Sequence, residues 1–195
     1  MTGRTTDERS SPVDEELFAG PVAELEAVLA AREARVVRRH DALSRLGLPI
    51  VTVTPVMPGP IKDCPASRRL QQSALDALEN LFRARQWSRT RLWAEAAPTG
   101  LEALFAVDAS SEEIKRALIN LETAEPLGRL WDLDVIDPRL GALSRRSLGL
   151  PVRRCILCSE AAHACARSRA HSLAELFRAI EVILNTAQSS FAARA

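Results

Sequence analysis

Apolar positions along the 195-residue chain recur with helical spacing in some stretches and with strand-like alternation in others. Spacings of three and four predict one long helix near each end of the chain and two between them. The second internal helix should start at a capping box formed by Ser110 and Glu113, and the last at one formed by Ser172 and Glu175. The predicted helices span residues 21–46, 66–86, a stretch beginning at 110, and 173–187. Gly47 is the expected C-cap of the first.

Four shorter runs are rich in β-branched or alternating apolar residues and predict strands at 50–56, 91–97, 101–107 and 129–136. The turn Pro98-Thr99-Gly100 should join the second and third as a hairpin. The resulting order, β-α-β-β-α-β, is that of the ferredoxin-like split βαβ arrangement. The sequence therefore predicts an α+β fold with a ferredoxin-like core, an N-terminal helix, and a C-terminal cysteine-rich segment followed by a helix.

In that core a four-stranded antiparallel sheet carries two helices on one face, with strands 50–56 and 129–136 near its middle. Residues 1–12 are polar and are expected to be disordered, while 13–195 should form a single domain. The charged residues of the first helix are interpreted as a solvated outer face. They are Glu24, Glu26, Arg32, Glu33, Arg38 and Arg39.

Composition excludes some classes of protein. Hydrophobic residues make up 47% and charged residues 26%, as in ordinary soluble proteins, and a net charge of +1 gives no global attraction to nucleic acid or membrane. No apolar run approaches the length of a membrane span, and no signal-peptide pattern is visible, so a cytoplasmic location is expected. Of 26 basic residues only Lys62 and Lys115 are lysines.

The fourth predicted strand contains two aspartates two positions apart. Side chains alternate across a strand, so Asp132 and Asp134 should project from one face, together with Leu130 and Ile136. Neighbouring carboxylates repel each other and lose hydration, and a divalent cation relieves both costs. Oxygen ligands of this kind suit Mg²⁺, which completes its shell with water and substrate phosphates. The simpler alternative is that both aspartates are solvated or paired with arginines.

A second group of ligands lies near the C-terminus, where Cys155, Cys158, Cys165 and His171 fall within seventeen residues. Thiolates and an imidazole at such spacings suit tetrahedral Zn²⁺ in a structural site, with His163 as an alternative fourth ligand. The alternative interpretation is three buried thiols without a metal. Cys64 stands apart and is interpreted as an ordinary thiol.

Three pairs of adjacent arginines flank these motifs, at 68–69, 145–146 and 153–154. Such pairs are usually solvated. Arg68 and Arg69, however, stand at the start of a predicted helix, whose free N–H groups also favour phosphate. Carboxylates that bind a metal, together with arginines, are what phosphoryl or nucleotidyl transfer requires.

Taken together, these motifs resemble the apo-citrate lyase phosphoribosyl-dephospho-CoA transferases, also called citrate lyase holo-acyl-carrier-protein synthases (the CitX family). The resemblance covers residues 49–184. It is carried by PGPIKD at 58–63, Arg68-Arg69, Glu122, PLGRLWDLDV at 126–135, Ser144-Arg145-Arg146, Leu150-Pro151, RRC at 153–155 with Cys158, Cys165-Ala166-Arg167 and His171. Cys64 departs from the family pattern, where a more polar residue is expected.

The resemblance implies a nucleotidyltransferase. Such an enzyme joins the phosphoribosyl-dephospho-CoA of 2′-(5″-triphosphoribosyl)-3′-dephospho-CoA to a serine of the acyl carrier (γ) subunit of citrate lyase and releases pyrophosphate. On this hypothesis the aspartates hold Mg²⁺, and Glu122 or Asp63 takes the serine proton or completes the metal shell. Candidates for holding the substrate phosphates are Lys62, Arg68, Arg69, Arg129, Arg145, Arg146 and Arg153.

The competing class is a binding module in which a zinc knuckle and the arginines contact nucleic acid. Near-zero net charge and basic pairs without interleaved aromatics argue against it, and the chain has no tyrosine. We therefore expect neither nucleic acid nor membrane as a partner.

Overall fold

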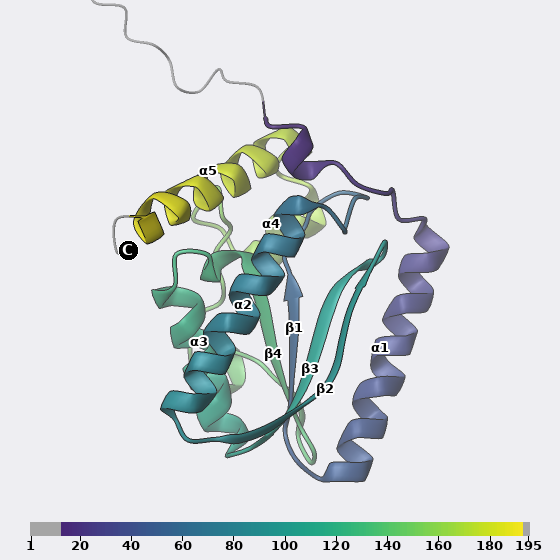
Figure 1. The fold of residues 1–195 in the computed structure, drawn as a ribbon, viewed down its shortest axis with the longest axis vertical. Coiled ribbons are helices and arrows are strands. Elements are labelled where there is room, and N and C mark those ends of the chain that lie inside the picture. The colour runs from purple at the N-terminus through teal and green to yellow at the C-terminus, as the bar shows by residue number, and fades with distance from the viewer. Residues whose placement is uncertain (1–12, 193–195) are drawn as a thin grey trace, which may run out of the picture.

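The computed structural model describes residues 13–192, so the disorder expected for 1–12 lies outside the described residues. The fold is mixed α and β, built on one antiparallel sheet with helices on both faces (Figure 1). The sheet has five strands in the order β2-β3-β1-β4-β5, one more than the sequence predicted. The strands are β1 (Ile50–Pro55), β2 (Ser88–Ala97), β3 (Gly100–Asp108), β4 (Trp131–Asp137) and β5 (Gly141–Leu143).

The predicted order of elements between β1 and β4 is found: strand, helix, hairpin, helix, strand. β1 lies in the middle of the sheet, between β3 and β4. The additional strand, β5, pairs with only the last three residues of β4, so the first half of β4 has a free edge. That free edge becomes important for the site.

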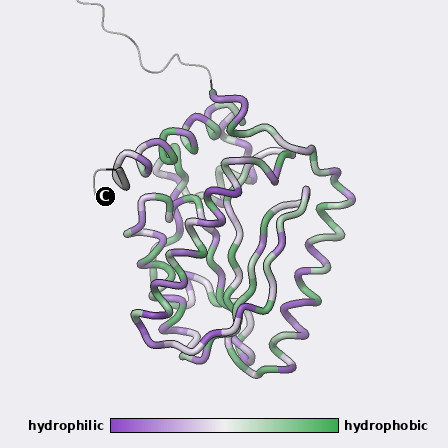
Figure 2. Tube along the Cα trace, viewed as in Figure 1, coloured by the Kyte–Doolittle hydropathy of each residue, from purple (hydrophilic) through white to green (hydrophobic). Residues whose placement is uncertain are grey.

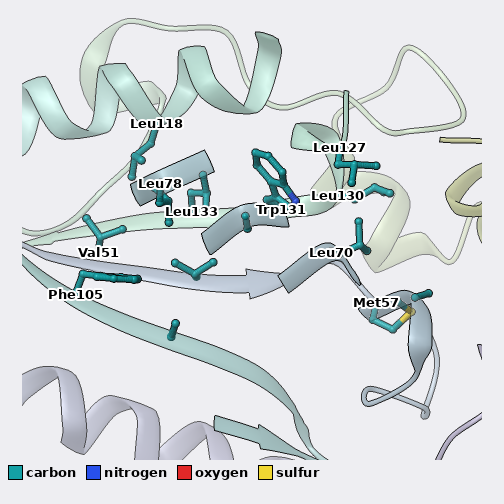
Figure 3. Packing of buried hydrophobic residues seen from close by; sticks show 14 of the residues in the cluster. Val51, Met57, Leu70, Leu78, Phe105, Leu118, Leu127, Leu130, Trp131 and Leu133 are labelled. Carbon is teal, nitrogen blue, oxygen red and sulfur yellow. The ribbon is translucent and has the colours of Figure 1, made fainter. Parts of the chain in front are cut away.

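The main hydrophobic core lies on one face of the sheet, under α2 (Pro65–Ala84) and α3 (Ser111–Ala124). Trp131 and Leu133 of β4 point into this core beside Leu78 and Leu118 (Figure 3). Leu130, expected on the aspartate face, is instead fully buried in this core. It belongs to a short 3₁₀ turn before the strand, where strand alternation does not apply.

The opposite face of the sheet is covered by α1 (Leu25–Leu46), which ends at Gly47 in the left-handed conformation, as predicted. A small apolar cluster around Ala42 lies beneath its C-terminal half. The predicted solvated face of this helix is confirmed for Glu24, Glu26, Arg32 and Glu33, which are exposed. It is wrong for Arg38, which faces inward and donates to Glu102 of β3, and for the partly buried Arg39, while Leu25 and Val36 are exposed. Figure 2 shows polar and apolar residues mixed along α1 rather than gathered in one stripe.

The remaining elements precede α1, lie between α3 and β4, or follow β5. They are the 3₁₀ helices η2 (Glu16–Phe18), η3 (Gly128–Leu130) and η4 (Arg146–Leu148), together with α4 (Ala162–Ser168) and α5 (Leu173–Ala192). The Ser172–Glu175 capping box is confirmed, because each side chain accepts from the other residue's backbone N–H. The Ser110 box is wrong, because its side chain makes no capping bond. Within the described range, no helix combines the length and apolarity needed to cross a bilayer.

Candidate functional site

The aspartate pair, Asp132 and Asp134, projects from the α1-side face of the sheet. In the antiparallel register of β1 and β4, Asp132 stands opposite Thr54 and Asp134 opposite Thr52. Cross-strand partners share a face, so two carboxylates and two hydroxyls form a polar area there, as the alternation predicted. The side chains of Asp132 and Asp134 are 55% and 50% exposed, so both remain accessible to a ligand.

The electrostatics of the pair are unfavourable for two negative charges. Although its side chain is half exposed, partial loss of hydration among the surrounding protein atoms raises the pKa of Asp132. The neighbouring Asp134 and, more weakly, Glu122 raise it further. Arg153 and Lys115 act in the opposite direction and only partly compensate. A divalent cation would supply the missing positive charge, and two oxygen ligands with open positions suit Mg²⁺.

The free edge of β4 is closed by charged side chains instead of a neighbouring strand. Lys115 of α3 donates to the carbonyl of Leu133 (2.9 Å) and lies 3.3 Å from Asp134 Oδ1. Glu122 accepts from the Leu133 N–H (3.3 Å), and Arg153 donates to the Trp131 carbonyl (2.7 Å). These bonds satisfy edge groups that would otherwise be unpaired, and they fix the backbone that carries the aspartates.

Glu122 is buried, and both of its carboxylate oxygens have partners. One accepts from Leu133 and the other pairs with Arg145. Gly128 packs against the backbone of Glu122 so closely that a Cβ would overlap it. Glu122 therefore supports the β4 backbone that carries the aspartates, and it holds Arg145 beside that backbone.

Asp63, the other acid proposed from the sequence, is likewise buried and paired. It accepts two bonds from Arg68, at 2.7 and 2.9 Å, and hydrogen bonding to Arg68 lowers its pKa despite its burial. No hydrogen bond or ion pair among the described residues connects it to the aspartate pair.

Lys62 lies beside the turn of the β2–β3 hairpin, where its Cβ and a guanidinium nitrogen of Arg35 both lie within 4 Å of the position a Cβ on Gly100 would take. Its ammonium donates to the Met57 carbonyl (2.6 Å), and burial, followed by the charge of Arg32, lowers its pKa. Gly100 and Glu102 are two positions apart on β3, so a side chain on Gly100 would point to the same face of the sheet as Glu102, which is also the face of the aspartates. Because Lys62 lies beside that position, it lies on the aspartate side of the sheet. β1 separates β3 from β4, which implies about 10 Å between their axes.

The other candidate arginines differ in what they contact. Arg153 Nη1 is 3.7 Å from Asp132 Oδ1, the only ion pair of Asp132 within residues 13–192. Arg129 donates to the carbonyls of Arg154 and Cys155, both at 3.0 Å. The guanidinium groups of Arg69 and Arg146 make no hydrogen bond or ion pair with any described residue, and Arg146 is exposed.

The cysteine cluster, formed by Cys155, Cys158, Cys165 and His171, is brought together as predicted. Its ligand atoms all lie within 4.8 Å of one another, and the group could hold a metal ion such as zinc. Cys158 Sγ is 3.5 Å from Cys165 Sγ and 3.4 Å from His171 Nε2. The alternative ligand His163 is exposed and does not belong to the group.

The pKa values of Cys155 and Cys165 are shifted in opposite directions. Burial raises the pKa of Cys155, but backbone N–H donors from Leu157 and Cys158 and the neighbouring thiols bring it down to about 7. Hydrogen bonding to Cys158, and then burial, raise the pKa of Cys165 to about 12. Close thiols therefore do not ionise together unless a cation stabilises them.

Sequence reasoning missed Lys115, although the signal was present. Ser111, Ile114, Lys115, Leu118 and Glu122 lie on the buried face of α3. A lysine and a glutamate seven residues apart on an apolar helix face indicate buried partners, because an unpaired charge there would be costly. It also missed the pairing of Glu102 with Arg35 and Arg38, which no local pattern marks.

The chain is similar to proteins of one known family. Residues 23–187 match the family model described as apo-citrate lyase phosphoribosyl-dephospho-CoA transferase. Relatives with that name include proteins from Escherichia coli O9:H4 (39% identical, covering 87% of this chain and 93% of the relative) and Citrobacter koseri (41%, covering 84% and 89%). A third, from Shigella boydii serotype 18, is 38% identical over 87% of this chain and 93% of the relative. The chain thus belongs to the family of apo-citrate lyase phosphoribosyl-dephospho-CoA transferases.

Proposed function

We propose that this protein transfers the phosphoribosyl-dephospho-CoA group to apo-citrate lyase, the activity that its relatives' names describe. The donor is 2′-(5″-triphosphoribosyl)-3′-dephospho-CoA, and the acceptor is a serine of the acyl carrier (γ) subunit. The serine oxygen attacks the α-phosphorus, the bond from that phosphorus to the bridging oxygen breaks, and pyrophosphate leaves.

The observation that carries the proposal is the half-exposed aspartate pair on a strand whose free edge is fixed by charged side chains. Asp132 and Asp134 would hold Mg²⁺, which supplies charge neutralisation on the phosphates of the donor. The fit rests on two oxygen ligands and on the raised pKa of Asp132, which a bound cation would reverse.

Among the candidate phosphate ligands, Arg153 has the strongest support because it already lies beside Asp132. Lys62 lies on the same side of the sheet, and Arg69 and Arg146 have guanidinium groups not engaged by described residues. Arg68, Arg145 and Arg129 are bound to Asp63, Glu122 and backbone carbonyls, so we assign them to positioning.

The proton of the attacking serine needs an acceptor. Glu122 and Asp63 have less support than the sequence suggested, because both are paired with an arginine. Asp132 and Asp134 are the accessible carboxylates of the site, and an oxygen of this pair that does not hold the metal would accept the proton.

Three further features belong to the proposal. The strand order and the run of elements from β1 to β4 support a ferredoxin-like core. A hydrophobic core that takes residues from Phe18 to Ala187 supports a single domain. A cytoplasmic location stays a prediction from the sequence. Neither the family match nor the named relatives favour the nucleic-acid-binding alternative.

The deciding experiment is the intact mass of the carrier subunit after incubation with this protein and the donor, with Mg²⁺ or with EDTA. We expect a mass gain equal to the phosphoribosyl-dephospho-CoA group only in the presence of Mg²⁺. A gain in both samples would keep the function and exclude the proposed metal role of the aspartates. No gain with a folded protein and a competent carrier would contradict the function itself.

A further inference from the structure

The cysteine cluster gathers four ligand atoms within 4.8 Å of one another, and the separations from Cys158 Sγ suit a tetrahedral metal. With metal–sulfur bonds of about 2.3 Å and metal–nitrogen bonds of about 2.0–2.1 Å, a regular tetrahedron has edges of about 3.8 Å between sulfurs and about 3.6 Å between sulfur and nitrogen. The observed separations from Cys158 Sγ, 3.5 Å to Cys165 Sγ and 3.4 Å to His171 Nε2, are close to both values.

The backbone of this segment is arranged around the cluster. Cys155 donates its N–H to the Glu160 carbonyl (2.7 Å), and Leu157 N–H points at Cys155 Sγ (3.5 Å). Cys165 comes from α4, a helix of only seven residues. Arg169 then adopts a positive φ of 51°, which is unfavourable for a non-glycine residue, just before the chain brings His171 to the thiols.

Few apolar contacts hold this segment in place. Cys155 and Cys165 are its only buried side chains between 155 and 171; Ile156 is partly buried against the main core, and Leu157 is exposed. A segment with so little apolar burial needs another source of stability, and a bound metal supplies it because binding energy becomes folding energy. Three sulfurs and one imidazole nitrogen favour Zn²⁺ over Mg²⁺, and four protein ligands leave no open position.

Two arginines join the cluster to the aspartate strand, and each donates to backbone carbonyls in the segment of the other. Arg129, just before β4, donates to the carbonyls of Arg154 and Cys155. In return, Arg153 donates to the carbonyls of Arg129 (2.6 Å) and Trp131 (2.7 Å), and its Nη1 lies 3.7 Å from Asp132 Oδ1. The residue that reaches Asp132 thus stands two positions before the first cysteine.

We propose that Cys155, Cys158, Cys165 and His171 bind one Zn²⁺ in a closed structural site, and that this site positions Arg153 beside Asp132. The metal takes no part in the transfer reaction. The zinc site stands independently of the reaction, whereas the positioning of Arg153 for catalysis rests on the proposed function.

The first test is metal analysis of the purified full-length protein and of the protein reconstituted with Co²⁺. We expect about one zinc per chain and, with cobalt, the visible absorption of a tetrahedral thiolate site. His171→Ala and Cys158→Ser should lose both signals. The matched control is His163→Ala, an exposed histidine in the same segment, which should keep them. A protein that takes up neither metal, or equal zinc loss in His163→Ala and His171→Ala, would overturn the site.

The second test addresses positioning through the kinetics of transfer. Arg153→Met should raise the KM for the donor while keeping its zinc, and His171→Ala should raise the same KM by a similar factor. The double variant should be no worse than the single ones, since both changes remove one interaction. Independent, multiplying effects, or a donor KM unchanged by zinc loss, would overturn the positioning role.

The outcomes separate the two proposals. Zinc bound by the wild-type protein, with no mass gain on the carrier, would keep the zinc site and reject the proposed function. Metal-dependent transfer by a protein that binds no zinc would do the reverse.

Discussion

The aspartate pair and the cysteine cluster differ in how completely the protein surrounds a potential metal. The aspartate pair offers two carboxylates that are each about half exposed, on a strand face beside a single arginine. The cysteine cluster gathers four ligand atoms within 4.8 Å, with two of its cysteines buried. An incomplete shell leaves room for water and substrate, whereas a complete one does not. We therefore propose that the first group carries the chemistry and that the second supports the structure.

Removing one carboxylate should have the largest effect. Asp132→Asn keeps the shape of the side chain but removes the charge of a proposed metal ligand. A contribution of several kcal/mol from this ligand corresponds to a loss of about 10³-fold in transfer rate. The rate is measured by the mass gain of the carrier. Asp137→Asn, on the same strand but paired with Ser111 away from the site, is the matched control and should retain transfer. Near-normal transfer by Asp132→Asn would exclude the open metal site.

Removing the Glu122 side chain, which supports the strand of the aspartate pair, should mainly lower the stability of the fold. Glu122→Ala leaves Arg145 and the Leu133 N–H without their partner, which should lower the free energy of unfolding by about 3 kcal/mol. Chemical denaturation measures this change. Glu112→Ala, which breaks an exposed pair with Arg116 on the same helix, should cost only about 0.5 kcal/mol. Equal effects of the two changes would mean that Glu122 does not support the strand.

Replacing Lys115 should have a smaller effect, on the Mg²⁺ requirement of the transfer reaction. Lys115→Met frees Asp134 from its ion pair and leaves the Leu133 carbonyl unbonded, so the Mg²⁺ concentration needed for half-maximal transfer should change by about 10-fold. Arg116→Met, one position further along α3, is the control for helix stability. A Mg²⁺ requirement that matches the control would remove Lys115 from the site.

The smallest expected effect is on stability: the charges of Asp63 and Asp132 should change the stability of the fold in opposite directions as pH rises. The pKa of Asp63 is lowered by Arg68, so its charge stabilises the fold above the unfolded pKa of about 3.9 and the gain is lost as pH falls through the lower folded value. The pKa of Asp132 is raised, so its charge disfavours the fold above that raised value. At neutral pH, Asp63→Asn should therefore lower the Tm and Asp132→Asn should raise it.

Both differences in Tm from the wild-type protein should disappear at acidic pH, which Tm measurements across the pH range would check. A lower Tm for Asp132→Asn at neutral pH would contradict the unfavourable environment assigned to this carboxyl. No change for Asp63→Asn would show that its pairing with the exposed Arg68 adds no stability.

Local periodicity determined much of this protein without any structure. Alternation placed Asp132 and Asp134 on one face, and the spacing of three cysteines and a histidine placed four ligands within reach of one another. Gly47 and the Ser172–Glu175 box marked helix ends correctly. These features depend on residues close in sequence, whose relative positions are set by the geometry of one strand, turn or helix.

Only the tertiary structure decided what surrounds the aspartates. Lys115 and Glu122 can close the edge of β4 only because β5 is too short to cover it. Arg38 turns inward because Glu102 lies on β3, two strands away from the strand of Asp132. The pairing of Arg153 with Asp132 requires the chain to return after β5. Such contacts join residues far apart in sequence. Strand order and packing bring them together, and no local period encodes that.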